Sequence, residues 1–166
     1  MNILLTGGAG YIGSHTALSL IDQGHRVTII DNLVSGDKNL VPNKATFYEN
    51  DIADIKFVQK VLKENKFDLV MHFAGLVKVE ESIKFPEKYN LYNVEKAKIF
   101  FQNCFDSGLN KVIFSSTAAI YGKAKSNTKV KETDDLKPSN PYALTKLKIE
   151  EFLINLSFKK KVSCII

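Results

Sequence analysis

Short apolar runs alternate with longer segments of helical periodicity along most of the chain. Each run is rich in Val, Ile, Leu or Phe and has the length of a buried strand. This alternation is typical of units in which two parallel strands are joined by a helix. We therefore expect strands at about residues 2–6, 26–31, 46–50, 68–74, 111–116 and 161–166.

Four segments between these runs carry apolar residues at the spacing of one helix face. Gly24 and Gly108 follow two of them, at the place where a helix commonly ends in a left-handed residue. Pro141 suits the first turn of the last segment, and Ser139 or Asn140 is placed to cap it. The predicted helices are Tyr11–Gln23, Asp54–Asn65, Pro86–Ser107 and Pro141–Phe158.

The pattern predicts an α/β fold, a doubly wound parallel sheet of the Rossmann type in three layers. A length of 166 residues, 45% of them hydrophobic, suits one such domain over residues 1–166. The gap between the second and third strands and residues 123–137 show no strong period, so surface loops are expected there. Because the last strand reaches residue 166, we expect the substrate domain to be absent and the chain to be a fragment or a truncated gene product.

The net charge of +5 comes almost entirely from lysines spread along the chain, and Arg26 is the only arginine. Base readout and bidentate phosphate recognition depend largely on arginine, so no nucleic-acid partner is expected. The one tight basic cluster, Lys159–Lys161, is expected to be a solvated turn before a strand. The apolar start, Met1–Thr6, is too short for a signal peptide or a membrane span, so we expect a cytoplasmic protein with no membrane partner.

The residues that most often bind metals are scattered. Cys104 and Cys164 form no C-x-x-C pair and predict neither a disulfide framework nor a zinc site. His15, His25 and His72 also lack the spacing that would bring several ligands to one ion. We expect no metal.

A glycine-rich turn, Thr6–Gly13, follows the first predicted strand and opens the first predicted helix. Gly7 permits a tight turn, Gly10 lets the backbone approach a pyrophosphate, and Gly13 lets the helix pack close to the strand. The amino end of the helix then offers N–H groups and the positive end of its dipole to an anion. Since any strand-to-helix turn uses glycine, the pattern alone is also compatible with an ordinary turn.

Asp31 supplies the context that the turn needs. It ends the second predicted strand, where a carboxylate accepts hydrogen bonds from the adenosine ribose hydroxyls of a dinucleotide. A basic residue there would suit a 2′-phosphate, so Asp31 favours NAD over NADP. The sequence contains no G-x-x-x-x-G-K-[ST] segment, which argues against a P-loop nucleotide triphosphatase.

Tyr142 and Lys146 lie four residues apart and hence on one helix face. An ammonium near a phenol, together with the positive ring of an oxidised nicotinamide, favours phenolate and is expected to lower the tyrosine pKa. Alone, such a pair is more often a solvated helix face. Thr117 changes the balance because it follows the fifth strand at the sheet edge where cofactors lie, and it could bridge a sugar hydroxyl and Tyr142.

Several segments together resemble the extended short-chain dehydrogenase/reductase family, and most narrowly its UDP-glucose 4-epimerases. The glycine turn and the Y-x-x-x-K pair are shared across the whole superfamily. Three segments point more narrowly to the epimerases: Asp31–Leu33, His72–Gly75 and Glu81–Ser82. The segments are Thr6–Gly13, Asp31–Leu33, Asp51–Ile52, His72–Gly75, Glu81–Ser82, Ser115–Thr117 and Tyr142–Lys146.

The resemblance implies roles for these residues. Tyr11 and Ile12 would contact the pyrophosphate, and Asp51 and Ile52 would flank the adenine. Lys146 would hold the nicotinamide ribose and adjust the pKa of Tyr142. The predicted catalytic residues are Tyr142, Lys146 and Thr117. The predicted cofactor-binding residues are Gly7, Gly10, Tyr11, Ile12, Gly13, Asp31, Asn32, Leu33, Ser35, Gly36, Asp51, Ile52, Phe73, Ala74, Gly75, Leu76, Tyr142 and Lys146.

The resemblance also implies an activity. That activity is NAD-dependent epimerisation at C4 of a UDP-hexose through a transient 4-keto sugar, in galactose metabolism. A UDP-sugar substrate is expected, together with a homodimer packed through residues 86–107 and 141–158. The chain departs from the family pattern at three places. Val77 stands where lysine is frequent, and Lys78 follows one residue later. Tyr92 precedes Asn93 where a pair of asparagines is usual, and Glu95-Lys96 replaces the usual Gly-Thr.

Two alternatives stay open. A nucleotide-sugar dehydratase would need an acid soon after Thr117 to protonate the leaving hydroxyl, and Ala118 and Ala119 stand there instead. A non-catalytic NAD-binding module would keep the glycine turn and Asp31 without needing Tyr142. Binding of NAD without binding of a UDP-sugar would favour the module.

Overall fold

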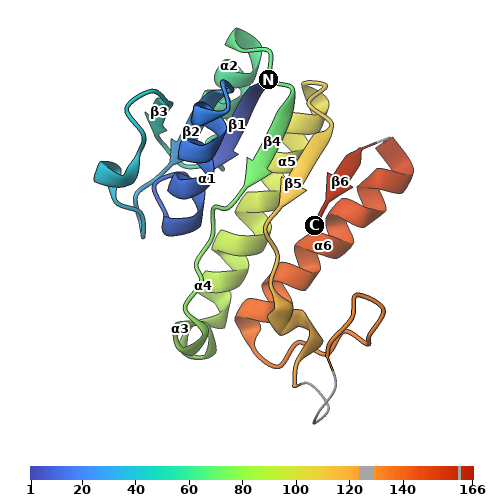
Figure 1. Ribbon diagram of the computed structural model, residues 1–166. Coiled ribbons are helices and arrows are strands. Elements are labelled where there is room, and N and C mark those ends of the chain that lie inside the picture. Colours follow the sequence, from blue (N-terminus) through green and yellow to red (C-terminus); the bar gives the residue numbers. More distant parts are fainter. Residues whose placement is uncertain (124–128, 161) are drawn as a thin grey trace.

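A computed structural model describes residues 1–123, 129–160 and 162–166. The chain forms one parallel six-stranded sheet with the order β3-β2-β1-β4-β5-β6 (Figure 1). The strands are β1 (Asn2–Thr6), β2 (Arg26–Asp31), β3 (Thr46–Glu49), β4 (Leu69–His72), β5 (Lys111–Phe114) and β6 (Ser163–Ile165). The predicted α/β fold and all six predicted strands are confirmed, with ends shifted by a few residues.

Six α-helices and three short helical turns connect the described strands. The α-helices are α1 (Tyr11–Asp22), α2 (Ile55–Glu64), α3 (Val79–Lys84), α4 (Pro86–Asn90), α5 (Lys96–Asp106) and α6 (Pro141–Lys160). The turns are the 3₁₀ turns η1 (Lys38–Leu40) and η3 (Ala118–Tyr121) and the π-helical turn η2 (Leu91–Glu95). Every connection between paired strands is a crossover, as parallel pairing requires.

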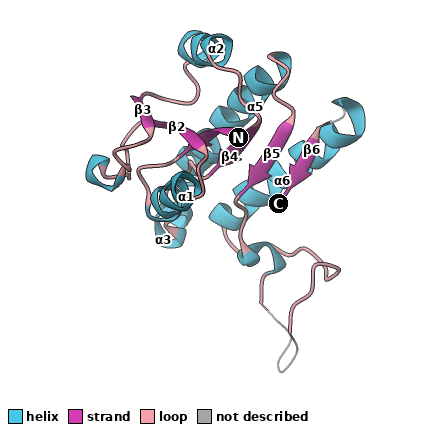
Figure 2. Cartoon of the chain, turned by 45° about the horizontal axis from the view of Figure 1, so that its top comes forward, coloured by secondary structure: helices cyan, strands magenta, loops and turns pink. Residues whose placement is uncertain are grey.

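Helices pack on both faces of the sheet, and β1 and β2, at its centre, are covered on both sides. On one face α2, α5 and α6 pack over a core that includes Leu4, Val58, Phe101 and Ile149. On the other face α1 packs against β1 and β2 in a smaller cluster around Leu5. Figure 2 shows α1 on one side of the strands and α2, α5 and α6 on the other.

The helix ends follow the predicted chemistry. Gly24 and Gly108 have φ angles of 82° and 87° just beyond α1 and α5, a backbone that glycine adopts without strain. Asn140 caps α6, since its side-chain oxygen accepts a hydrogen bond from the Ala143 N–H at 2.8 Å. Asn140 rather than Ser139 is therefore the cap.

The helix expected over residues 86–107 is confirmed as a continuous helical run, in which the π-helical turn η2 separates α4 from α5. A short helix before it, α3, was not predicted, and one prediction of local structure is wrong. The helix α6 continues to Lys160, so the turn expected at residues 159–160 is absent, while residue 161 lies outside the described residues. In the expected loop 123–137, residues 124–128 likewise lie outside them.

The parallel register brings the strand ends to one edge of the sheet. Thr6 pairs with Ile30 on one side and with His72 on the other, and His72 pairs with Phe114. The segments that follow β1, β2, β4 and β5 therefore leave the sheet side by side. These segments carry the predicted functional residues.

Candidate functional site

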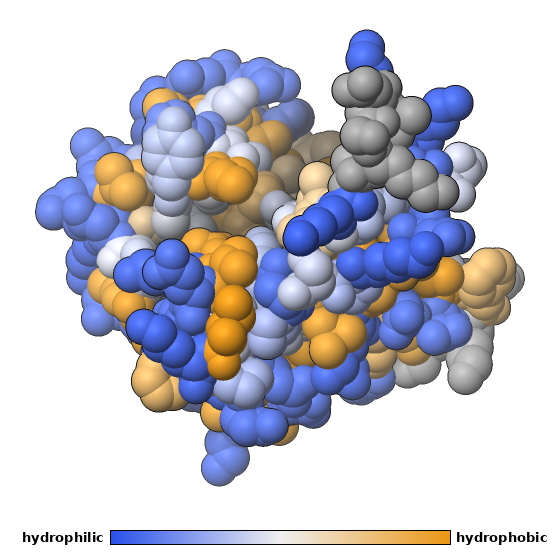
Figure 3. Space-filling model, turned by 90° about the horizontal axis from the view of Figure 1, so that it is seen from below, coloured by the Kyte–Doolittle hydropathy of each residue, from blue (hydrophilic) through white to orange (hydrophobic). Residues whose placement is uncertain are grey.

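A cavity of about 570 Å³ lies along the carboxyl ends of the strands. This volume is in the usual range for small-molecule and cofactor sites. Figure 3 views the molecule from this side and shows a hollow bordered by both apolar and polar surface. Apolar walls with a few polar groups suit a ligand with ring and charged parts.

The glycine turn is tightly packed at two of its predicted positions. Gly7 has a φ of 74°, and a Cβ there would lie 2.5 Å from the Ala74 backbone nitrogen. A Cβ at Gly13 would lie 2.2 Å from the Gly7 carbonyl oxygen. Glycine is therefore sterically required at both positions, and the first turn of α1 directs backbone N–H groups into the cavity.

Asp31 is fixed beside this turn. Asp31 is 9% exposed as a residue, and its carboxylate accepts hydrogen bonds from the Ala9 N–H at 3.0 Å and the Leu33 N–H at 2.9 Å. Leu33 has a φ of 56°, which bends the chain away from β2 after the carboxylate. A carboxylate can accept about four hydrogen bonds, so Asp31 keeps acceptor capacity on the cavity side.

At the far end of the cavity, Asp51 forms an ion pair that the sequence did not reveal. Lys96 on α5 donates to it at 2.5 Å, and Asn32 donates to the same carboxylate oxygen at 3.1 Å. Burial raises the pKa of Asp51, but these bonds and one from the Ala53 N–H outweigh burial and hold the pKa below its ordinary value. Lys96 also lies 4.2 Å from the centre of the Tyr92 ring.

The wall formed after β4 is held by Asn93. Its side chain accepts from the Leu76 N–H at 2.8 Å and donates to the Leu76 carbonyl at 2.9 Å. It also donates to the Thr145 hydroxyl on α6 at 3.2 Å. Asn93 lies in the π-helical turn η2, and π turns are frequent at functional sites.

Tyr142 faces the cavity from the first turn of α6. Burial raises the pKa of its phenol, while a side-chain hydrogen bond with Thr117 lowers it, and burial dominates. The Thr117 oxygen accepts from the Ala119 N–H at 3.2 Å, which leaves its proton for Tyr142. The tyrosine pKa was expected to be lowered, and in the protein without cofactor its direction is the opposite.

Lys146 lies one turn further along α6 and is 5% exposed. Its ammonium donates to the Ser115 carbonyl at 2.9 Å and lies 5.0 Å from the centre of the Phe114 ring. Burial lowers its pKa to about 8. The predicted pair therefore shares one helix face, but in the protein alone Lys146 bonds to the β5 loop rather than to the phenol.

In the sequence, Ser82 contributed only to the family resemblance, but in the structure it contacts Tyr142. Its fully buried hydroxyl accepts from the Tyr142 N–H at 3.2 Å and donates to the Val79 carbonyl at 2.6 Å. A short helix, α3, thus fixes the start of α6. The sequence signal was Glu81-Ser82, but nothing in the pattern assigned it a partner.

The structure brings most of the predicted cofactor residues together. All of them except Leu33 and Lys146 line the cavity. Thr117 is outside the lining and contacts the site through its hydrogen bond with the Tyr142 phenol. Sequence reasoning did not assign several further lining residues to the cofactor site. These are Ile30, Asn50, Val77, Lys78, Tyr92, Lys96, Ser115 and Ser116.

Other kinds of site have less support. A hollow of about 640 Å³ at the opposite sheet edge lies between the carboxyl ends of α2 and α5, away from the glycine turn. Within residues 1–123, 129–160 and 162–166, no three His, Cys, Asp or Glu side chains are grouped to hold a metal ion. Among the same residues no helix combines the length and apolar character needed to span a bilayer.

The sequence matches the NAD dependent epimerase/dehydratase family over residues 3–166. A UDP-glucose 4-epimerase of Lacticaseibacillus casei is 41% identical over 153 residues, which are 92% of this chain and 46% of that protein. The chain therefore spans about half the length of the curated relatives it matches.

Two solved structures carry the same fold. The Thermus thermophilus UDP-glucose 4-epimerase in complex with NAD is 31% identical, with a TM-score of 0.95 over 99% of this chain and 53% of that chain. The Thermotoga maritima UDP-glucose 4-epimerase with UDP-glucose is 33% identical, with a TM-score of 0.94 over 99% of this chain and 53% of that chain. The predicted resemblance is confirmed at the level of family and fold.

Proposed function

Because the chain belongs to the NAD dependent epimerase/dehydratase family, we propose that its cavity binds NAD and serves epimerisation at C4 of a UDP-hexose. One observation carries the proposal. The glycine turn, Asp31 and Tyr142 were singled out separately in the sequence, and they line one cavity. Similar proteins are UDP-glucose 4-epimerases, which supports the choice of substrate.

The residues present fit a dinucleotide. The α1 amino terminus, with Gly10 and Gly13 in the cavity lining, offers backbone N–H groups to a diphosphate. Asp31 accepts from ribose hydroxyls and would repel a 2′-phosphate, which favours NAD over NADP. Phe73, Gly75 and Leu76 line the wall towards the reactive end.

In the proposed reaction Tyr142 takes the proton of the sugar C4 hydroxyl as a general base. When bound, NAD⁺ supplies the acceptor for the C4 hydride and later returns it, so no net oxidation results. Thr117 donates a hydrogen bond to the phenol and stabilises its phenolate form. Lys146 supplies a buried positive charge on the same helix face, which favours the phenolate further. Inversion at C4 then requires rotation of the transient 4-keto sugar.

The first test is calorimetry of this chain with NAD, NADP and UDP-glucose. We expect NAD to bind more tightly than NADP, and Asp31→Ala to weaken NAD binding about tenfold or more, equivalent to about 1.4 kcal/mol. Lys38→Ala, which removes an exposed ion pair near the same loop, is the matched control. Equal affinity for NAD and NADP would contradict the assigned role of Asp31.

The second test is sugar-dependent reduction of the cofactor and interconversion of UDP-glucose and UDP-galactose. Tyr142→Phe should lower the rate about 10²-fold or more, as expected for loss of a general base. Tyr48→Phe, whose ring packs on Phe57, should leave it unchanged. An unaltered rate in Tyr142→Phe would remove the catalytic assignment.

NAD binding without turnover is the second candidate function, because the predicted NAD contacts lie within this chain, which spans about half of its relatives. NAD binding without UDP-sugar binding would favour it. A dehydratase is less well supported, since Ala118 and Ala119 follow Thr117 in η3 and neither can protonate a leaving hydroxyl.

A further inference from the structure

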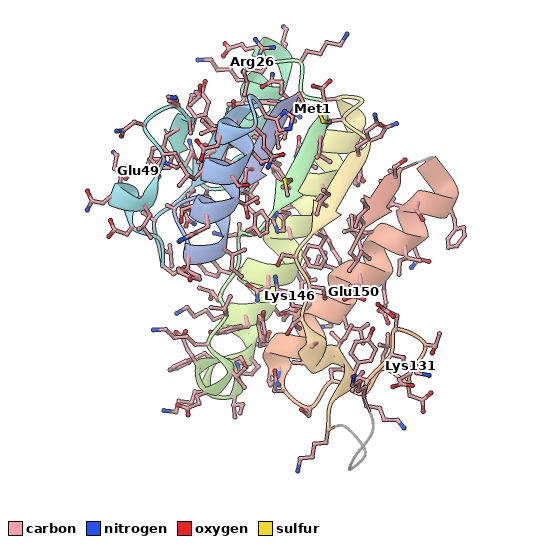
Figure 4. The ribbon with its side chains drawn as sticks, viewed as in Figure 1. Met1, Arg26, Glu49, Lys131, Lys146 and Glu150 are labelled. Atoms are coloured by element: carbon pink, nitrogen blue, oxygen red, sulfur yellow. The ribbon has the colours of Figure 1, made fainter. Side chains whose placement is uncertain are left out.

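Three consecutive residues after β5 each bond to a different residue of α6. The α6 partners are spaced four apart, so they lie along one helix face. Figure 4 labels two of them, Lys146 and Glu150, near the end of β5. The pairs are Ser115 with Lys146, Ser116 with Glu150, and Thr117 with Tyr142.

Of the three α6 partners, Glu150 is the one with no part in the proposed reaction. It lies two helical turns from Tyr142, which is about 12 Å along the helix axis. Glu150 is 8% exposed as a residue, and its carboxylate accepts a hydrogen bond from the Ser116 hydroxyl. A buried carboxylate is costly unless it is paired or hydrogen-bonded, so its presence here calls for a role.

We propose that Glu150 is a positioning residue that holds Ser116 and thereby sets the register of residues 115–117 against α6. The inference rests on the proposed role of Tyr142. Ser116 and Thr117 are neighbours in the chain, yet their hydroxyls bond to residues two turns apart on α6. Two anchors in opposite directions prevent this segment from sliding along the helix.

The consequence falls on Tyr142 through Thr117. Thr117 has extended backbone, with φ −151° and ψ 140°, and caps the short turn η3 that follows it. With the Ser116 anchor released, the segment keeps the bonds of Ser115 to Lys146 and to the His72 carbonyl, and the bonds of Thr117 within η3, but nothing ties Ser116 to α6. Thr117 can then shift together with η3, which lengthens its contact with the phenol. Glu150 therefore acts on the phenol without touching it.

The test is a ¹³Cζ-tyrosine NMR titration of this chain without cofactor or sugar, with Tyr142→Phe to assign the signal. Glu150→Ala should raise the Tyr142 pKa by about half a pKa unit or more, as expected when one hydrogen bond to the phenolate is lost. Glu150→Gln should restore most of the wild-type value, because its amide oxygen still accepts from Ser116. Glu151→Ala, one residue along and exposed, is the control and should leave the pKa unchanged.

Ser116→Ala provides an independent route and should raise the Tyr142 pKa as Glu150→Ala does. It also keeps the test decisive if Glu150→Ala does not fold. A folded Glu150→Ala or Ser116→Ala with the wild-type Tyr142 pKa would overturn the proposal, and so would an equal shift in Glu151→Ala. Since no cofactor is present, a failure to bind NAD would count against the proposed function alone.

Discussion

Lys96 Nζ lies 2.5 Å from Asp51 Oδ2, although the two residues are 45 positions apart in sequence. The pair joins α5 to the loop after β3 at one end of the cavity. Both side chains are mostly buried, with relative exposures of 20% and 30%. Such a pair is less screened by solvent than a surface ion pair.

Lys96→Met should lower the free energy of unfolding near pH 7 by about 1 kcal/mol, the upper range for a partly exposed pair. The pKa of Asp51 is lowered in the folded protein, so the stabilisation is present above its ordinary value of 3.8 and is lost as the pH falls through the folded pKa. The difference between wild type and variant should therefore disappear in acid. Urea titrations at several pH values measure it.

Lys60→Met is the matched control, since Lys60 forms an exposed pair with Glu64 at 3.9 Å. Its effect should be close to zero at every pH. A Lys96→Met difference that persists unchanged at low pH would show that packing on Tyr92, rather than the charge of Asp51, explains the loss.

His72 should make the protein sensitive to acid. Its ring is 1% exposed, and its Nδ1 lies 2.7 Å from the Thr6 hydroxyl. Burial, assisted by the charge of Lys146, lowers its pKa to about 3. The unfolded chain thus binds a proton below about pH 6.5 that the folded chain does not, so stability falls as the pH falls, by about 2 kcal/mol between pH 7 and 5.

Urea titrations at pH 7 and 5 test this expectation. His72→Phe should be less stable at pH 7, because it leaves Thr6 without its partner, but its stability should change less with pH. His15→Asn, at an exposed position, should keep the wild-type slope. A wild-type slope in His72→Phe would assign the acid sensitivity to other groups.

Lys146 should titrate near its lowered pKa of about 8, which ¹³Cε NMR of the lysines measures directly. The folded protein then releases this proton before the unfolded chain does. Between about pH 8 and 10 the lysine adds up to about 1.4 kcal/mol of stability per pH unit, a gain that Lys146→Met would lack. Lys148→Met, which loses only an exposed bond to Asn90, is the control. Titration of Lys146 near pH 10.5 would contradict the burial argument.

The sheet was predictable because β1, β2, β4 and β5 each carry a run of mostly apolar residues that are largely buried. The glycine turn and Asp31 were predictable because their roles depend on residue type at one place in a strand–helix unit. By contrast, α3 has six residues, too few to establish a period. The helix over residues 86–107 was predictable, but its π turn at Asn93 was not, because a π turn changes the helix register without changing composition.

The missed contacts share another cause. Ser82 with Tyr142 and Lys96 with Asp51 are polar pairs between distant segments, and hydrophobic periodicity contains no information about which polar side chains meet. The direction of the Tyr142 pKa was missed for a related reason. Sequence spacing brought Lys146 to the same helix face, but Lys146 donates to the Ser115 carbonyl and burial dominates at the phenol.

Asn93→Ala should cost about 2–4 kcal/mol, because it leaves both the N–H and the carbonyl of Leu76 without their side-chain partner in a buried place. It should also weaken NAD binding, since Leu76 lines the cavity wall. Asn103→Ala removes an exposed amide bonded to Gln59 and should cost well under about 1 kcal/mol. Equal losses for the two variants, measured by urea denaturation, would show that the Leu76 bonds contribute little.

Gly13→Ala separates the steric role of the glycine turn from its conformational role. Gly13 needs no unusual backbone, but a Cβ there would lie 2.2 Å from the Gly7 carbonyl oxygen, so the turn must move. We expect a loss of about 1–3 kcal/mol in stability and at least about tenfold in NAD affinity. Gly24→Ala is the counterpart, because its Cβ meets nothing within 4 Å while its φ of 82° strains alanine.

Gly24→Ala should therefore cost about 1 kcal/mol of stability and leave NAD affinity unchanged, as calorimetry and urea denaturation would show. The comparison is informative because both variants add one methyl group to the same strand–helix–strand unit. If Gly13→Ala bound NAD as the wild type does, the first turn of α1 would not be the phosphate site. The placement of the cofactor along the carboxyl edge of the sheet would then fail with it.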